Sequence, residues 1–279
     1  MQPTDYESLE QAVYLLETNN FVTMLAQLIG RPADALIASL PAFVGKAIAK
    51  ASQAAIMQCL KFAMKPRNPR SLLVLAGKHP SLVTGIAGAV GGFGGLAALA
   101  VELPFTTVVM FQSIIGIAEE AGEDISQPEV RMACLEVFGL SADGKGPAAK
   151  ESGYYATRGA LAQSAREASD YVLRRGTSMN AGPAAIEFVT ALAPRFGLLV
   201  SQELAAAAVP IIGAAAGSSL NIAFVQHFNN VARGHFAVRA LERKYGEERV
   251  REEFELIRTT ERRLRKPKRL EKTVESVSV

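Results

Sequence analysis

The pattern of hydrophobic and polar positions is dominated by two long uncharged stretches, residues 82–101 and 204–226. Each reaches the ~20 residues that a helix needs to cross a bilayer. Both consist mainly of Gly and Ala, however, and these small side chains gain little from burial in lipid. Small residues at helical spacing instead let two helix backbones approach closely. We therefore expect both stretches to pack tightly against other helices or to lie on a membrane. The glycines expected at close helix crossings are Gly88, Gly92, Gly213 and Gly217.

Apolar residues at helical spacing predict a succession of helices along the chain. The first, over residues 5–19, has Leu9, Val13 and Leu16 on one face. Gly122 and Gly246 are placed to end two later helices. Residues 126–129 have the Ser-x-x-Glu capping pattern, with Ser126 as the expected N-cap and Pro128 at the start of the helix. The other helices are expected over residues 41–64, 104–121, 126–140, 154–174, 183–199 and 218–245. Dense Val/Thr/Tyr alternation is missing, so the sequence predicts an all-α, multi-helix bundle.

Charge is nearly balanced over the 279 residues, with a formal net charge of +3. Binding of nucleic acid by the chain as a whole is therefore not expected. Positive charge is concentrated in residues 262–269, RRLRKPKR, where it favours contact with an anionic surface. The residues expected to make this contact are Arg262, Arg263, Arg265, Lys266, Lys268 and Arg269.

The start of the chain is acidic and has no apolar core, so it does not resemble a secretory signal. Cys59 and Cys134 are too few and too far apart for a disulfide framework. A reducing, cytoplasmic setting is therefore expected.

Two glycine-containing motifs have features of nucleotide-binding loops. GLSADGKG, residues 139–146, has the G-x-x-x-x-G-K spacing of a phosphate-binding loop. That loop needs a Ser or Thr after the Lys and a strand before it. Here Gly146 occupies the hydroxyl position and a predicted helix precedes the motif. The run GGFGGLA likewise lacks a preceding strand. A loop between helices is the favoured interpretation, and no cofactor is expected.

Glu102, Glu136, His227 and His235 are the candidate ligands of a metal site. Helix bundles build such sites from Glu and His that point inward from facing helices. However, His227 and His235 are two turns apart along one helix, too far to share an ion unaided. Neither a Glu-x-x-His nor a His-x-x-x-His pair is present. Helix-end and core polar contacts are therefore favoured, and the metal site is kept as the alternative.

Residues 232–246, ARGHFAVRALERKYG, predict a solvated helix face of alternating charge. Glu242 is expected to pair there weakly with Arg239 or Arg243. Phosphate headgroups are the alternative partners of Arg233, His235, Arg239 and Lys244. Tyr154 and Tyr155, at the start of an earlier helix, are expected to make core or interface contacts.

Five blocks follow one another along the chain: ELPFTTVVMFQSIIGIAEEAGED, VRMACLEVFGL, ESGYYATRGAL, RFGLLVSQELAAAAVPIIGAAAGSSLN and HFNNVARGHFAVRALERKYG. A weaker block, FVTMLAQLIGRPADALIASLP, lies near the start. Together they closely resemble the EcsC protein family over roughly residues 21–246. The family is named for the third product of an operon that encodes an ABC transporter linked to protein secretion and processing. The resemblance supplies this context but no catalytic residues.

The resulting division is an amphipathic helix over residues 1–20, an EcsC-like helical domain over 21–246, and a charged C-terminal helix with a disordered tail over 247–279. The expected function is that of a non-enzymatic helper, cytoplasmic and peripheral at the inner face of a membrane. Its expected partner is the membrane surface or a membrane protein complex, and homo-oligomerisation stays open. Two alternatives remain: a metal-dependent helical enzyme using the Glu and His candidates, and an integral protein whose two Gly/Ala stretches form a membrane hairpin.

Overall fold

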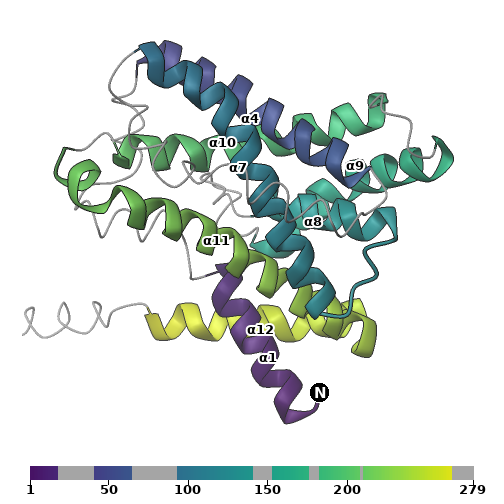
Figure 1. The fold of residues 1–279 in the computed structure, drawn as a ribbon. Coiled ribbons are helices and arrows are strands. Elements are labelled where there is room, and N and C mark those ends of the chain that lie inside the picture. The colour runs from purple at the N-terminus through teal and green to yellow at the C-terminus, as the bar shows by residue number, and fades with distance from the viewer. Residues whose placement is uncertain (18–40, 65–92, 141–152, 176–181, 208–209, 266–279) are drawn as a thin grey trace, which may run out of the picture.

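A computed structural model describes residues 1–17, 41–64, 93–140, 153–175, 182–207 and 210–265 (Figure 1). Helices and no strands make up this part of the chain, which confirms the all-α, multi-helix architecture predicted from the sequence. The helices are α1 (Pro3–Glu17), α4 (Ala42–Ala63), α7 (Phe93–Glu120), α8 (Pro128–Leu140), α9 (Tyr154–Arg175), α10 (Pro183–Ala207), α11 (Pro210–Tyr245) and α12 (Glu247–Arg265).

Helix α8 lies at the centre of the bundle, in contact with α4, α7, α9, α10 and α11. Every residue from Met132 to Gly139 is buried, so all sides of this helix are covered by protein. The ring of Phe138 packs 5.2 Å from those of both Phe196 on α10 and Phe228 on α11, measured between ring centroids. Aromatic side chains bury large areas and prefer such edge-on or tilted contacts. Phe138 thus joins three helices in the main hydrophobic core.

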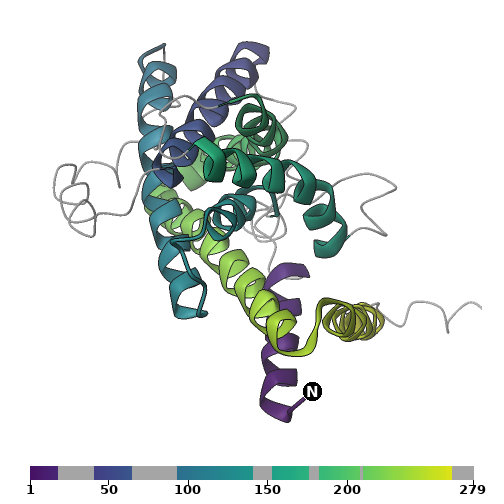
Figure 2. The same cartoon turned by 90° about the vertical axis from the view of Figure 1, so that its right-hand side faces the viewer.

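Helices α1 and α12 form a second, smaller hydrophobic cluster with the start of α9 and the end of α11. Leu9 and Val13 of α1 are fully buried there, as predicted from the first amphipathic pattern, beside Phe254 of α12. Figures 1 and 2 show α1 and α12 together at the lower end of the molecule, against the C-terminal half of α11. At the same junction Glu17, which ends α1, accepts a hydrogen bond of 2.8 Å from the backbone N–H of Tyr154. A carboxylate at this position stabilises the N-terminus of α9.

Three helix boundaries differ from the sequence prediction. Helix α7 begins at Phe93, not at Pro104, which lies inside it. Helix α10, which contains Pro194, continues past its predicted end at Leu199 to Ala207, and α11 begins at Pro210 and not at Ser218. An internal proline removes one backbone hydrogen bond and crowds the preceding turn. The extensive packing of α7 and α10 against α4 outweighs that local cost.

The predicted ends of two helices are confirmed by backbone geometry. Gly122 and Gly246 have φ of 79° and 87°, the left-handed conformation that glycine adopts without strain. Helix α8 begins at Pro128, as predicted. The predicted N-cap, Ser126, lies two residues before it. The side chain of Asp124 accepts hydrogen bonds from the Ser126 N–H and the Gln127 side-chain amide, and so forms the turn before the helix.

Close helix crossings occur at glycines that the sequence did not single out. A Cβ added at Gly234 of α11 would lie 2.7 Å from Leu16 and 3.2 Å from the Ala12 carbonyl oxygen on α1. One added at Gly139 of α8 would lie 2.6 Å from Leu192 on α10. Gly88 and Gly92 lie outside the described residues. Gly213 and Gly217 belong to α11, but their surroundings are also outside the described part, so their predicted crossings stay predictions.

Candidate functional site

A buried polar network connects the first two turns of α9 with the C-terminal half of α11. Tyr154 and Arg158 are four residues apart on α9, and His235 and Glu242 are seven apart on α11, so each pair lies on one helix face. The Tyr154 hydroxyl lies 2.8 Å from Nδ1 of His235, and Nη1 of Arg158 donates to the same hydroxyl at 3.3 Å. Nη1 of Arg158 also donates to Glu242 at 2.7 Å.

These contacts assign the protons. Because Arg158 donates to the Tyr154 oxygen, the hydroxyl hydrogen is directed to Nδ1 of His235, which places the imidazole proton on Nε2. Burial, together with the positive charges of Arg158 and Arg239, lowers the pKa of His235 well below its usual value. The imidazole is therefore neutral at physiological pH. His235 Nε2 is buried and has no hydrogen-bond partner among the described residues.

The charged residues of α11 pair differently from the sequence prediction. Arg239 donates to Glu123, just beyond α7, through Nε at 2.8 Å, and Arg243 pairs with the same carboxylate. Glu242 instead pairs with Arg158 and accepts a hydrogen bond of 3.0 Å from Tyr155. The prediction of a solvated face over residues 232–246 was therefore wrong, because α1, α9 and α12 cover much of it.

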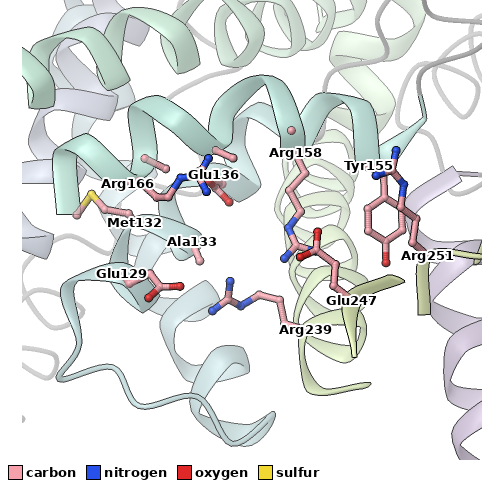
Figure 3. A pocket seen from close by; sticks show the side chains of 13 residues that line it. Glu129, Met132, Ala133, Glu136, Tyr155, Arg158, Arg166, Arg239, Glu247 and Arg251 are labelled. Carbon is pink, nitrogen blue, oxygen red and sulfur yellow. The ribbon is translucent and has the colours of Figure 1, made fainter. Parts of the chain in front are cut away.

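A pocket of about 300 Å³ adjoins this network and is lined by residues of α8, α9, α11 and α12 (Figure 3). Its charged lining residues are Arg158, Arg166, Arg239, Arg251, Glu129, Glu136 and Glu247. In Figure 3, Arg166 lies at the end near Glu136 and Arg251 at the end beside Tyr155. Arg158 and Arg239 approach from opposite sides between them.

Glu136 is the most deeply buried carboxyl group of this pocket, with 6% of its surface exposed. Burial raises its pKa to about 7, while the positive charges of Arg158, Arg239 and Arg166 act in the opposite direction. The desolvation of the carboxylate is thus the larger effect. Near neutral pH this group exchanges a proton easily, and it does so in contact with the pocket.

The four candidate metal ligands lie on three different helices. Glu102 is on α7, partly buried, Glu136 is on α8, and His227 and His235 are two turns apart on α11. Within the described residues, no three His, Cys, Asp or Glu side chains come close enough together to hold a metal ion. Of the four, only Glu136 lines the arginine-containing pocket.

The six basic residues proposed for anionic contact fall at the end of the described chain. Arg262, Arg263 and Arg265 belong to the last turns of α12, whereas the positions of their side chains lie outside the description, as do Lys266, Lys268 and Arg269. The contact and the disordered tail therefore stay predictions.

A second pocket, of about 420 Å³, lies between α4 and α10. It is lined by Gly45 and Ala49 of α4 and by Thr190, Gly197 and Leu198 of α10, among others, and no charged residue lines it. One described stretch, Pro183–Ala206 of α10, is by length and composition apolar enough to cross a bilayer, with a mean hydropathy of 1.4, and half of its apolar 18-residue window is buried. Of the two Gly/Ala stretches of the sequence, residues 93–101 belong to α7, residues 204–207 to α10 and residues 210–226 to α11, whereas the side-chain surroundings of residues 93–101 and 207–221 lie outside the description.

Sequence reasoning missed Arg158, Arg166 and Glu123. Their types and spacing resemble those of an ordinary surface. Only the packing of the helices shows that Arg158 and Arg166 lie near the buried Glu136 and that Glu123 binds Arg239. Tyr154 and Tyr155 were correctly predicted as core contacts, and both are buried. Nothing in the sequence around the two tyrosines indicates their hydrogen bonds to α11.

The comparisons with known proteins give one match. The model of the EcsC protein family matches residues 75–241, which is more than half of the chain and includes the described helices from α7 into α11. This range is narrower than the predicted 21–246 and omits α1, α4 and α12. No curated protein and no solved structure matches the chain. The chain belongs to the EcsC protein family.

Proposed function

We propose that this protein is a non-enzymatic helper that associates peripherally with the inner face of a membrane, in the ABC-transporter or protein-secretion processes to which its family is linked. One observation carries the proposal: α10 exposes a stripe of uncharged side chains opposite the side that is buried in the core. One side is buried in the core through Phe188, Leu192 and Phe196. The opposite side exposes Ile186, Thr190, Pro194 and Leu198 at intervals of four residues.

This exposed stripe has the chemistry of a surface that contacts lipid acyl chains. Its four side chains carry no charge, although the exposed Glu187 lies beside them, and the stripe borders the uncharged pocket between α4 and α10. Exposed apolar surface of this kind is a typical mark of membrane or protein interaction. Lys46 and Lys50 are exposed on α4, next to Gly45 and Ala49 of the same pocket. Positive charges beside an apolar surface favour anionic lipid headgroups.

Flotation of the purified protein with vesicles of phosphatidylcholine and phosphatidylglycerol tests the proposal. Ile186→Glu and Leu198→Glu each place a charge in the stripe, and we expect each to reduce the bound fraction severalfold. Leu173→Glu is the matched control, since Leu173 is 62% exposed on α9, away from the pocket between α4 and α10. Circular dichroism must show that all three variants fold. Equal binding by the stripe variants and the control would contradict the proposal.

The two alternatives give different results. A membrane hairpin formed by the Gly/Ala stretches would resist carbonate extraction from native membranes, whereas a peripheral protein is released. A metal-dependent enzyme would carry stoichiometric metal after purification without chelator. A binding protein has no such requirement.

A further inference from the structure

The pocket between α8, α9, α11 and α12 contains more positive than negative charge. Arg158, Arg166 and Arg239 all lie near enough to Glu136 to lower its pKa. An arginine offers five N–H donors in a fixed plane and has no acceptor. The three guanidinium groups near Glu136 therefore present an array of donors that suits an electron-rich ligand.

Two of these arginines are held in place by side chains that lie outside the pocket lining. Arg239 uses Nε and Nη2 to bind the two oxygens of Glu123, at 2.8 and 3.4 Å. Arg158 uses Nη1 to bind Glu242 and Tyr154. Both side chains are mostly buried, with 16% and 18% exposed respectively. The other N–H groups of the two guanidinium groups take no part in these hydrogen bonds. Both arginines line the pocket. The carboxylates thus fix the orientation of the guanidinium groups before any ligand arrives, which lowers the entropic cost of binding.

The other two arginines complete the pocket from its exposed side. Arg166 is exposed on α9, two turns beyond Arg158. Arg251 of α12 lies 5.6 Å from the centre of the Tyr155 ring, at the opposite end of the pocket. A cation held over an aromatic face is oriented without losing its charge.

We propose that this pocket binds a small oxyanion of the phosphate class, with the anionic group held by Arg158, Arg166 and Arg239 beside Glu136. Arginine is well suited to such ligands, because its planar donors match two oxygens of a phosphate at once. The volume of about 300 Å³ accommodates a phosphate group with a small substituent. Arg251 and Tyr155 would then face the substituent. This inference does not depend on the proposed membrane association.

Glu136 gives the site a proton dependence. With a pKa of about 7, its carboxyl is neutral below neutral pH and then donates a hydrogen bond to an anion. Above neutral pH it is ionised and repels the anion. The charged and titratable groups that face it come from α8, α9, α11 and α12: Glu129, Tyr155, Arg158, Arg166, Arg239, Glu247 and Arg251. Binding should therefore weaken as the pH rises from 6 to 8.

Calorimetric titration of the full-length protein with sodium sulfate and with glycerol phosphate, in chloride buffers of constant ionic strength, measures this binding. Arg166→Glu is the test variant, because its side chain is exposed and no hydrogen bond of the buried network depends on it. Arg174→Glu is the matched control, with the same charge change on the same helix outside the pocket lining. We expect Arg166→Glu to weaken binding tenfold or more, and Arg174→Glu to change it less than twofold. Absence of binding to the native protein, or equal loss in the two variants, overturns the proposal.

Sulfate isolates the role of Glu136, because sulfate keeps both charges throughout this pH range. We expect sulfate affinity of the native protein to fall about tenfold between pH 6 and 8. In Glu136→Gln, where the side chain stays neutral, the affinity should be the same at both pH values and higher than native at pH 8. An unchanged pH dependence in this variant overturns the placement of the anion beside Glu136.

The phosphate group has two sources, which vesicles distinguish. If it belongs to a lipid headgroup, binding to vesicles containing phosphatidic acid falls in Arg166→Glu, stays in Arg174→Glu, and is competed by glycerol phosphate. If it belongs to a soluble compound, Arg166→Glu loses glycerol phosphate binding but binds the vesicles as the control does. Both results support the pocket. If vesicle binding falls equally in both variants and the native protein does not bind glycerol phosphate, the attraction to vesicles is a general effect of surface charge. That result overturns the proposed binding site.

Discussion

The hydroxyl of Tyr154 and Nδ1 of His235 lie 2.8 Å apart in the protein interior, although 81 positions separate the two residues in the chain. This hydrogen bond joins the start of α9 to the C-terminal half of α11. It also fixes the imidazole tautomer beside the arginine-containing pocket. Because both groups are buried, each depends on the other to replace the water that it loses on folding.

Replacement of Tyr154 by Phe should therefore destabilise the protein. The change keeps the ring but leaves Nδ1 of His235 buried without a donor, which costs about 1–3 kcal/mol. Urea denaturation followed by circular dichroism measures the loss. Tyr14→Phe is the control, because Tyr14 is 51% exposed, so that water replaces what its hydroxyl loses and the change stays within about 0.5 kcal/mol. Equal stability of the two variants would show that the buried hydrogen bond contributes little.

Glu203 on α10 predicts a specific dependence of stability on pH. It is 3% exposed, and burial raises its pKa to about 8. From its ordinary value of 4.5 up to about 8, the folded state holds a proton that the unfolded state has lost. This group's contribution is therefore fully present below pH 4.5 and is lost as the pH rises through 8, by up to about 1.4 kcal/mol per pH unit.

Glu203→Gln removes that dependence. The melting temperature of the variant relative to the native protein should rise from pH 5 to pH 8 and then level off. Glu187→Gln, an exposed change on the same helix, should show no such trend. A constant difference between Glu203→Gln and the native protein over this range would argue that Glu203 is ionised in the folded state.

Gly234→Ala should lower stability by about 1–3 kcal/mol through overpacking, because the new methyl group meets Leu16 and the backbone of α1. Gly116→Ala is the control, and it should raise stability. A Cβ there has no atom within 4 Å, and alanine favours a helix over glycine by roughly 0.5–1 kcal/mol. Thermal melts should move in opposite directions for the two variants. A shift in the same direction would contradict the close crossing of α1 and α11.

Deletion of residues 262–279 should weaken binding to anionic vesicles and leave the fold intact. Each positive charge near such a surface contributes ~1 kcal/mol. The buried residues Val250, Phe254 and Ile257 of α12 remain in the truncated chain. Vesicle pelleting and far-UV circular dichroism check the two parts of this prediction. Undiminished binding by the truncated protein would show that the basic segment is not a membrane contact.

The glycines of the two uncharged stretches remain testable in solution. If Gly92 and Gly217 lie at tight helix crossings, replacement of either by Leu should lower the melting temperature, with a typical overpacking cost of ~1–3 kcal/mol. In a segment without a close neighbour the same change is harmless. Unchanged melting of both variants would show that these segments do not pack closely.

The helices and two of their ends were determined by local sequence. The spacing of Leu9 and Val13 predicted the buried face of α1, and Gly122 and Gly246 ended their helices as expected. These features follow from the period of the helix and from the freedom of glycine at positive φ, and both act within a few residues. Local rules wrongly predicted that a helix begins at Pro104. They take account of the hydrogen bond that proline removes but not of the packing that offsets this loss.

The sequence by itself thus determined the fold class, the family and most of the helices of this protein. Only the tertiary structure decided which side chains meet. Glu136 looked like one member of a metal site, yet the packing of α8 against α9 and α11 surrounds it with arginines. Glu242 looked like a surface partner of Arg239, yet it binds Arg158 across helices. The physical reason is that helical periodicity places a residue on a face of its own helix. The partner of that face is chosen by long-range burial, which no local spacing encodes.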